Sequence, residues 1–403
     1  MLPISEKAKI MPLSPVRKLV PYADAAKERG VKVYHLNIGQ PDVPAPQEAL
    51  EAVKNNRLSL VSYPHSAGNA SYRQGLADYY RRIGIALSPD DIIITTGGSE
   101  AILIGFSTCF NPGDEVIVME PFYTNYNGIA AWTDVVLKPV PCDIRTNFAL
   151  PPASAFEQAI TPKTRGIVVC NPNNPTGYLY SRKELEQLAA IAKKHRLYLF
   201  ADEVYREFCY TDAPHVSCMQ LPDMDEHVVL IDSVSKRYSL CGVRIGAIIS
   251  RNREVMRSVL RFAQARLCSP AYGQLAAEGA LQTPPSYFSA VRNEYIARRN
   301  YMVDALNAMD GVYCPMPQGA FYTIVKLPVA DCDAFAQWLL EEFEYEKQTV
   351  MIAPASGFYA TPGKGLDEAR IAYVLNIEDL KKAMHCLERA LKQYRERDAD
   401  TAN

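Results

Sequence analysis

One lysine of this chain stands where its amine could act as a nucleophile. Lys236 lies among small hydroxyl residues in the run Ser233-Val-Ser-Lys236, and Arg244 follows eight positions later. A lysine that is desolvated and close to another cation loses its proton more readily, so that its amine can attack a carbonyl at neutral pH. The arginine supplies the forked donors that phosphate oxygens bind. This spacing favours a carbonyl-bearing phosphate ester held covalently; the alternative is an ordinary solvated lysine.

A carboxylate follows the apolar run Leu197–Ala201, which is typical of a buried strand. Asp202 would be costly to bury there unless it met a cation, and a protonated pyridine nitrogen is a suitable one. Holding such a ring protonated makes it an electron sink for a carbanion. Tyr205, three residues later, could donate to the ring's phenolate oxygen. Together with the lysine this pattern indicates pyridoxal 5'-phosphate, whereas Asp202 alone could equally cap a loop.

A glycine-containing turn could bind the phosphate. The run Thr95-Thr-Gly-Gly-Ser-Glu-Ala-Ile102 follows another apolar stretch and opens a predicted helix. Glycines let the backbone approach an anion, and the first N–H groups of a helix have no partner within it. Gly98, Ser99 and Glu100 would supply these donors. The alternative is an ordinary turn with Ser99 as the helix cap.

Two further loops after apolar runs carry candidate groups. The loop Cys170-Asn-Pro-Asn-Asn-Pro-Thr-Gly177 contains two prolines, which would hold Asn174 in a rigid turn at little entropic cost. Pro121-Phe-Tyr123 offers an aromatic face on which a planar ring could stack. The alternatives are a plain turn for the first loop and a packing role for Tyr123.

These residues need a scaffold, and short apolar runs alternating with amphipathic stretches predict one. Such alternation is typical of a mostly parallel sheet covered by helices on both faces, in which ligands bind beyond the carboxyl ends of the strands. Ser181 and Glu184 form a capping box at the start of the predicted helix Ser181–His195. The seven predicted strands are Ile92–Thr96, Glu115–Met119, Val135–Val140, Gly166–Cys170, Leu197–Ala201, Val228–Asp232 and Gly246–Ser250.

The pattern changes after Pro284, where a smaller α+β domain is predicted. We expect an N-terminal segment 1–47 that packs with it, a large domain 48–284 and a small domain 285–403. Segment 1–47 is rich in proline and shows no strong sheet pattern. The small domain is predicted to contain a helix Tyr287–Met309, a strand Ala320–Val325, a helix Ala334–Glu342, a short strand Val350–Ala353 and a closing strand and helix from Arg370.

Composition narrows the functional classes. The 403 residues carry a formal net charge of −2, which gives no electrostatic footprint for nucleic acid or an anionic membrane. The ten cysteines are scattered without zinc-binding spacing, so we expect no metal site. No apolar run approaches a membrane span and no secretory signal is evident. We therefore expect a cytoplasmic protein.

Taken jointly, the motifs resemble the class I and II aminotransferases, which are fold-type I pyridoxal-phosphate enzymes. The resemblance is closest to the bacterial aspartate aminotransferase-like branch, and it covers almost the whole chain in family order. The matching runs are Asn37-Ile-Gly-Gln-Pro-Asp42, Thr96-Gly-Gly-Ser-Glu-Ala101, Pro121-Phe-Tyr123, Asn173-Asn-Pro-Thr-Gly177, Ala201-Asp-Glu-Val-Tyr205, Ser233-Val-Ser-Lys236, Arg244-Ile-Gly246 and Glu368-Ala-Arg-Ile371.

The resemblance implies a role for each candidate. Lys236 would bond to the cofactor and carry the proton that leaves the substrate, and Arg370 would bind the substrate α-carboxylate beside the Gly39 backbone. Tyr63 matches a tyrosine that crosses to the partner's phosphate in an obligate homodimer. The remaining implied cofactor contacts are Asp202 at the ring nitrogen, Tyr205 and Asn174 at the ring oxygen, Tyr123 on the ring face, and the Gly98, Ser99 and Glu100 amides with Ser233 and Arg244 at the phosphate.

The implied reaction moves the amino group of an L-amino acid to a 2-oxo acid with ping-pong kinetics. Aspartate with 2-oxoglutarate is the first expectation, from the resemblance alone. Alanine, aromatic amino acids, methionine or kynurenine are alternative donors, and a β-lyase or decarboxylase would use the same lysine. A DNA-binding regulator on this fold is disfavoured, because the family's motifs begin at Asn37 and leave no room for a winged-helix domain.

Overall fold

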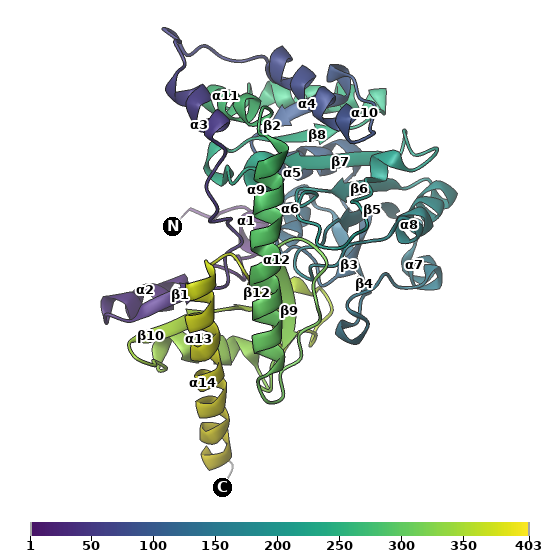
Figure 1. Cartoon of the computed structure of the whole chain (residues 1–403). Coiled ribbons are helices and arrows are strands. Elements are labelled where there is room, and N and C mark those ends of the chain that lie inside the picture. Colours follow the sequence, from purple (N-terminus) through teal and green to yellow (C-terminus); the bar gives the residue numbers. More distant parts are fainter. Residues whose placement is uncertain (1, 402–403) are drawn as a thin grey trace.

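A computed structural model describes residues 2–401, and its largest sheet has seven strands in the order β2-β8-β7-β6-β5-β3-β4 (Figure 1). All neighbours are parallel except β8, which runs antiparallel to β2 and β7. All seven predicted strands are present, within a few residues of their predicted bounds. They are β2 (Ile92–Thr95), β3 (Glu115–Glu120), β4 (Val136–Pro141), β5 (Thr164–Cys170), β6 (Tyr198–Asp202), β7 (Val228–Ser233) and β8 (Gly246–Ile249).

Helices cover both faces of this sheet because successive strand residues point to opposite sides. Ile92 and Ile94 of β2 pack in one hydrophobic core, and Ile93 packs in the other. The predicted capping box is present at the start of α8 (Arg182–His195), where Ser181 and Glu184 exchange hydrogen bonds. The first core includes residues of α3 (Gln47–Lys54), α4 (Ala70–Arg82), α7 (Ala153–Ala159), α8 (Arg182–His195) and α11 (Ala271–Ala280), and the second includes residues of α5 (Gly98–Cys109), α6 (Asn125–Thr133) and α10 (Arg253–Ala265).

Both ends of the chain meet around two smaller sheets. The N-terminal segment contributes β1 (Lys32–His35), which pairs in parallel with β10 (Gln348–Met351). The absence of a strand signal in segment 1–47 was therefore misleading, because β1 has only four residues and Tyr34 alone among them is fully buried. The other elements here are the antiparallel strands β11 (Ala353–Pro354), β12 (Glu368–Ala372) and β9 (Tyr322–Lys326), and the helices α12 (Pro285–Asn307), α13 (Cys332–Glu341) and α14 (Ile377–Thr401).

The first residues of the chain connect the two regions. Helix α1 (Glu6–Ile10) packs on α6 beside the large sheet, where Lys7 donates to the Trp132 carbonyl over 2.9 Å. Helix α2 (Val20–Glu28) packs on α13, on the other side (Figure 1). Residues 11–19 therefore cross from one region to the other. Within residues 2–401, no helix combines the length and the apolar character that crossing a membrane requires.

Candidate active site

A cavity of about 840 Å³ opens beyond the carboxyl ends of the large sheet's parallel strands. The loops after β3, β5, β6 and β7 contribute to it, together with the start of α5 and residues of β9 and β12. This position is the one expected for a ligand of a parallel sheet. The predicted site residues that line it are Gly39, Gly98, Ser99, Tyr123, Asn174, Asp202, Tyr205, Ser233, Lys236, Arg244 and Arg370.

Lys236 lies on the short helix α9 (Val234–Arg237), which begins directly after β7. Its Nζ donates to the Gly39 carbonyl over 2.7 Å. Burial lowers the pKa of Lys236 most, and the positive charges of Arg370 and Arg244 lower it further against an opposing effect of Cys241. A lowered pKa favours the neutral amine, which is the form that attacks a carbonyl or accepts a proton.

Asp202 is a buried carboxylate without a cationic partner. Tyr126 donates to its Oδ2 over 2.7 Å, and no arginine or lysine in the described part of the chain pairs with it. Burial is the main reason that its pKa rises to about 6. Asp232, at the end of the adjacent strand, is equally buried, but Arg237 donates to its Oδ1 over 2.6 Å and its pKa is lowered despite burial.

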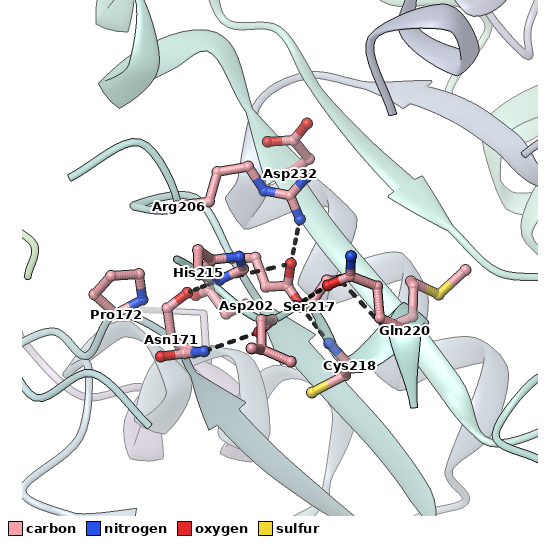
Figure 2. Close-up of polar contacts among 12 residues, drawn as sticks. Asn171, Pro172, Asp202, Arg206, His215, Ser217, Cys218, Gln220 and Asp232 are labelled. Atoms are coloured by element: carbon pink, nitrogen blue, oxygen red, sulfur yellow. Dashed lines mark hydrogen bonds and ion pairs between the residues drawn. The ribbon is translucent and has the colours of Figure 1, made fainter. Parts of the chain in front are cut away.

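Several of the polar groups near Asp202 pair with one another (Figure 2), although Nε and Nη1 of Arg206 have no hydrogen-bond partner. Glu203 forms an ion pair with Arg206 and accepts hydrogen bonds of 2.9 Å from both the Ser217 hydroxyl and the Cys218 backbone N–H. His215 lies 3.1 Å from the Asn171 carbonyl oxygen. Of the carboxylates in this buried cluster, that of Asp202 lines the cavity. It has no cationic partner among the described residues, so a positively charged group of a ligand could pair with it.

The opposite wall of the cavity is shaped to hold an anion. Gly97 precedes α5 with φ +80°, and a Cβ there would fall 2.4 Å from Nη2 of Arg244. The guanidinium therefore lies directly against the turn that begins the helix, where backbone N–H groups are unpaired. Ser233 lies beside it, with its hydroxyl bonded to Ser235 and the Ile245 carbonyl. A phosphate group fits this combination of helix start, hydroxyls and arginine.

The side chain of Glu100 has a local role. Its Oε2 accepts from the Thr96 N–H over 2.6 Å and lies 3.5 Å from Arg266. Glu100 does not line the cavity, so only its backbone N–H remains as the predicted phosphate donor.

Arg370 comes from β12, the central strand of the three-stranded sheet. Its Nη1 donates to Asn174 Oδ1 over 3.1 Å and its Nη2 to the Asn37 carbonyl over 2.5 Å, while its buried Nε has no partner. A Cβ at Gly39 would fall 1.5 Å from the Tyr322 hydroxyl oxygen, so only glycine fits there. A buried, incompletely bonded guanidinium beside a bare backbone can accept a carboxylate.

Tyrosines and an amide border the centre of the cavity. The Tyr205 hydroxyl lies 3.1 Å from that of Tyr322 and accepts from Asn174 Nδ2 over 3.4 Å. The Tyr123 and Tyr126 rings are edge to face, with centroids 5.5 Å apart. Two contacts were not predicted from the sequence: those of Tyr322 with Gly39, Arg370 and Tyr205, and the hydrogen bond from Tyr126 to Asp202. No motif marks either contact, since both depend on how separate elements pack.

Tyr63 lies apart from this group. Its side chain is 81% exposed and does not line the cavity of its own chain. Its predicted contact with a partner's phosphate stays a prediction.

Comparison with known proteins identifies the family of the chain. The profile of the family described as aminotransferase class I and II matches residues 31–387. The aspartate aminotransferase of Thermotoga maritima is 32% identical over 391 residues, covering 96% of this chain and 98% of that protein. The structures of Thermus thermophilus aspartate aminotransferase with maleate and of Pyrococcus furiosus alanine aminotransferase each superpose with a TM-score of 0.88 at 28% identity, covering 97% of this chain and all of theirs. The chain belongs to the class I and II aminotransferase family and is an aminotransferase.

Proposed function

We propose that this protein binds pyridoxal 5'-phosphate and moves the amino group of an L-amino acid, aspartate first, to a 2-oxo acid such as 2-oxoglutarate. The observation that carries the proposal is the buried carboxylate of Asp202, which has no cationic partner among the described residues. It lines the same cavity as the largely buried amine of Lys236. The family uses this cofactor, and the cavity residues fit it. Asp202 would hold its ring nitrogen, Tyr205 and Asn174 its ring oxygen, Tyr123 its ring face, and Ser233, Arg244 and the start of α5 its phosphate.

The cofactor, when bound, supplies an electron sink that lets the Cα–H bond of an amino acid break. The chain supplies orientation and a place for the proton. Arg370 binds the substrate α-carboxylate with two parallel donors, which fixes the Cα–H bond relative to the ring. Lys236, with its lowered pKa, would take the Cα proton at Nζ and deliver it to the cofactor's C4′ carbon before the 2-oxo acid product is released.

Two observations support aspartate as the first donor and alanine as the second candidate. The Thermotoga and Thermus relatives are named as aspartate aminotransferases, and the equally similar Pyrococcus structure is named as an alanine aminotransferase. Aromatic amino acids, methionine and kynurenine remain further alternatives. A β-lyase or decarboxylase would break a different bond of the same bound substrate.

A donor screen tests the proposal. The holoenzyme is incubated with single L-amino acids and 2-oxoglutarate, pyruvate or oxaloacetate, and the 2-oxo acid formed from the donor is measured. We expect aspartate with 2-oxoglutarate to be fastest, with parallel double-reciprocal plots as the sign of ping-pong kinetics. Release of carbon dioxide or ammonia without an acceptor would indicate a decarboxylase or lyase instead.

The variant Lys236→Ala provides the control for the site. It removes the amine that bonds the cofactor and carries the proton, so turnover should fall by at least about 10⁴-fold, within the range that removal of an essential catalytic group causes. The cofactor's visible absorbance should change with it. Full turnover of Lys236→Ala would overturn the proposed site.

A further inference from the structure

The cavity has more positive charge than the proposed reaction accounts for. Its lining contains the basic side chains Arg17, Lys236, Arg244 and Arg370, and Asp202 is its single acidic residue. In the proposed function Arg244 meets the phosphate, Arg370 the α-carboxylate and Lys236 the reacting carbon, while Asp202 meets the ring nitrogen. Arg17 has no assigned counterpart.

The segment that carries Arg17 is fixed at several points. Pro15 packs on Gly357, where an added Cβ would fall 2.3 Å from the proline Cβ. Asn37 Nδ2 donates to the Val16 carbonyl over 3.4 Å. Lys18 forms an ion pair with Asp333. The residues on both sides of Arg17 are thus held against the rest of the chain, and Arg17 itself lines the cavity.

The guanidinium of Arg17 has no counter-charge from the chain itself. It forms no hydrogen bond or ion pair with any other residue among 2–401, and Arg17 is an exposed residue that lines the cavity. Asn37 connects it to the α-carboxylate position, because the same residue bonds the Val16 carbonyl through its side chain and Arg370 through its carbonyl. Arg370 and Arg17 therefore line the same cavity, and Arg370 is buried whereas Arg17 is exposed.

We propose that Arg17 binds the second carboxylate of a dicarboxylic substrate and so selects aspartate and 2-oxoglutarate over monocarboxylic acids. The inference rests on the proposed function and names the substrate class of that same site. A planar guanidinium suits a carboxylate, which it can bind with two donors. In the proposed function the start of α5, the hydroxyls and Arg244 bind the phosphate. A second carboxylate on the substrate is therefore the negative charge left for Arg17 to bind.

The kinetic test compares two donors in one variant. In Arg17→Gln, kcat/KM for aspartate should fall about 10-fold, as expected for loss of a hydrogen bond to a charged group at a partly exposed site. The fall should lie mainly in KM. For alanine, which has no second carboxylate, kcat/KM should change less than about two-fold by the same reasoning. Arg17→Lys should recover part of the loss, because the charge returns without the fork.

The matched control is Lys9→Gln, which removes one positive charge from the same N-terminal segment outside the cavity. Lys9 pairs with Glu6 on α1 and does not line the cavity. Both donors should keep their wild-type kinetics in this variant. An equal loss of aspartate and alanine activity in Arg17→Gln, or no loss of either, would overturn the inference.

A binding test separates this inference from the proposed function. Succinate and butyrate have four carbons each and no amino group, and they differ by one carboxylate. Calorimetry on the holoenzyme should show tighter binding of succinate, with that advantage lost in Arg17→Gln and kept in Lys9→Gln. If no donor reacted in the screen but this pattern held, the reaction would be wrong and the role of Arg17 correct. If transamination held and both acids bound alike in wild type and Arg17→Gln, the role of Arg17 would be refuted.

Discussion

Asp202 and Asp232 show at the scale of single residues that burial alone does not set the charge of a carboxylate. Both end adjacent strands of the large sheet, β6 and β7, and both are almost fully buried. Arg237 holds the pKa of Asp232 below its usual value, whereas the pKa of Asp202 rises to about 6. The two aspartates differ in their partners: Arg237 supplies a positive charge to Asp232, whereas a ligand would have to supply one to Asp202.

The first residue-scale prediction follows from the pKa of Asp202. Its folded-state pKa of about 6 exceeds the usual 3.8, so ionisation costs the cofactor-free protein about 3 kcal/mol, at about 1.4 kcal/mol per unit. The cost is absent below about pH 4 and complete above about pH 6, so stability from this group falls as pH rises between them. Asp202→Asn should therefore unfold less readily than wild type at pH 7 when cofactor-free. Urea unfolding at a series of pH values measures the difference.

Asp232→Asn is the matched control for that measurement. It removes the partner of Arg237 and leaves a buried, unpaired guanidinium, so it should destabilise the protein by about 3–5 kcal/mol. A pH-independent difference between Asp202→Asn and wild type would contradict the raised pKa.

Most individual candidates could be identified from the sequence, because lysine, aspartate and arginine carry distinctive chemistry when they follow predicted buried strands. Eleven of them do line one cavity. Tyr322 and Arg17 could not be identified in this way. Tyr322 stands in a predicted strand as one of many aromatic residues, and Arg17 lies in a proline-rich segment with no periodicity to place it. Their relevance depends on packing between segments hundreds of residues apart.

At the scale of elements, the turn between β2 and α5 shows how backbone conformation prepares a site. Gly97 has φ +80° and ψ 171°, a region open essentially to glycine alone, and it lies against Arg244. This conformation directs the first N–H groups of α5 and the guanidinium toward the same space. The element, rather than any one side chain, forms the predicted phosphate site.

The element-scale prediction concerns Gly97→Ala. The added Cβ would fall 2.4 Å from Arg244 Nη2, so the arginine must move away from the start of the helix. We expect cofactor affinity to fall about 10-fold or more, as for loss of a hydrogen bond to a charged group, and stability to fall about 1–3 kcal/mol through backbone strain. Titration of the cofactor-free protein with pyridoxal 5'-phosphate measures the first effect.

Gly113→Ala separates the two effects. Gly113 also has a positive φ, of +84°, but an added Cβ there meets nothing within 4 Å. This variant should lose stability through strain and keep cofactor affinity. Equal affinity losses in both glycine variants would show that the effect is general and that the Arg244 position is not involved.

The elements themselves were largely predictable, and the exceptions share a cause. The strands of the large sheet were found because each is an apolar run long enough to be buried on both faces. Strand β1 was missed because Lys32–His35 is short and partly exposed, and its partner β10 lies more than 300 residues later. Such a strand is defined by its pairing with a distant segment, and the local sequence pattern gives no sign of that pairing. The division into domains at residues 47 and 284 stays a prediction.

At the scale of the whole molecule, Tyr63 and its surroundings lead to a prediction about assembly. The side chain is 81% exposed, and Leu60 and Val61 beside it are also exposed at 75% and 51%. Large apolar or aromatic side chains that gather within four positions on the surface are typical of a face that another protein covers. The resemblance to the family implies that this partner is a second copy of the chain, so that we expect a particle of twice 44.9 kDa.

Hybrid dimers test whether Tyr63 completes the partner's site. Tyr63→Ala should weaken cofactor binding about 10-fold, through loss of a hydrogen bond to a charged group, and Lys236→Ala should be inactive. In a hybrid of the two, one site combines the intact Lys236 of one protomer with the intact Tyr63 of its partner, and the other site lacks both. An excess of Lys236→Ala chains should therefore restore wild-type activity per Tyr63→Ala chain at limiting cofactor.

The exposed Tyr313 supplies the matched comparison, since it is 43% exposed and does not line the cavity. Tyr313→Ala should bind cofactor as wild type does and gain nothing from mixing. If Tyr63 acted within its own chain, the hybrid would carry the Tyr63 defect in its single lysine-containing site and mixing would restore nothing. Restoration by mixing thus requires both a dimer and a site built from two chains, since neither property alone would produce it.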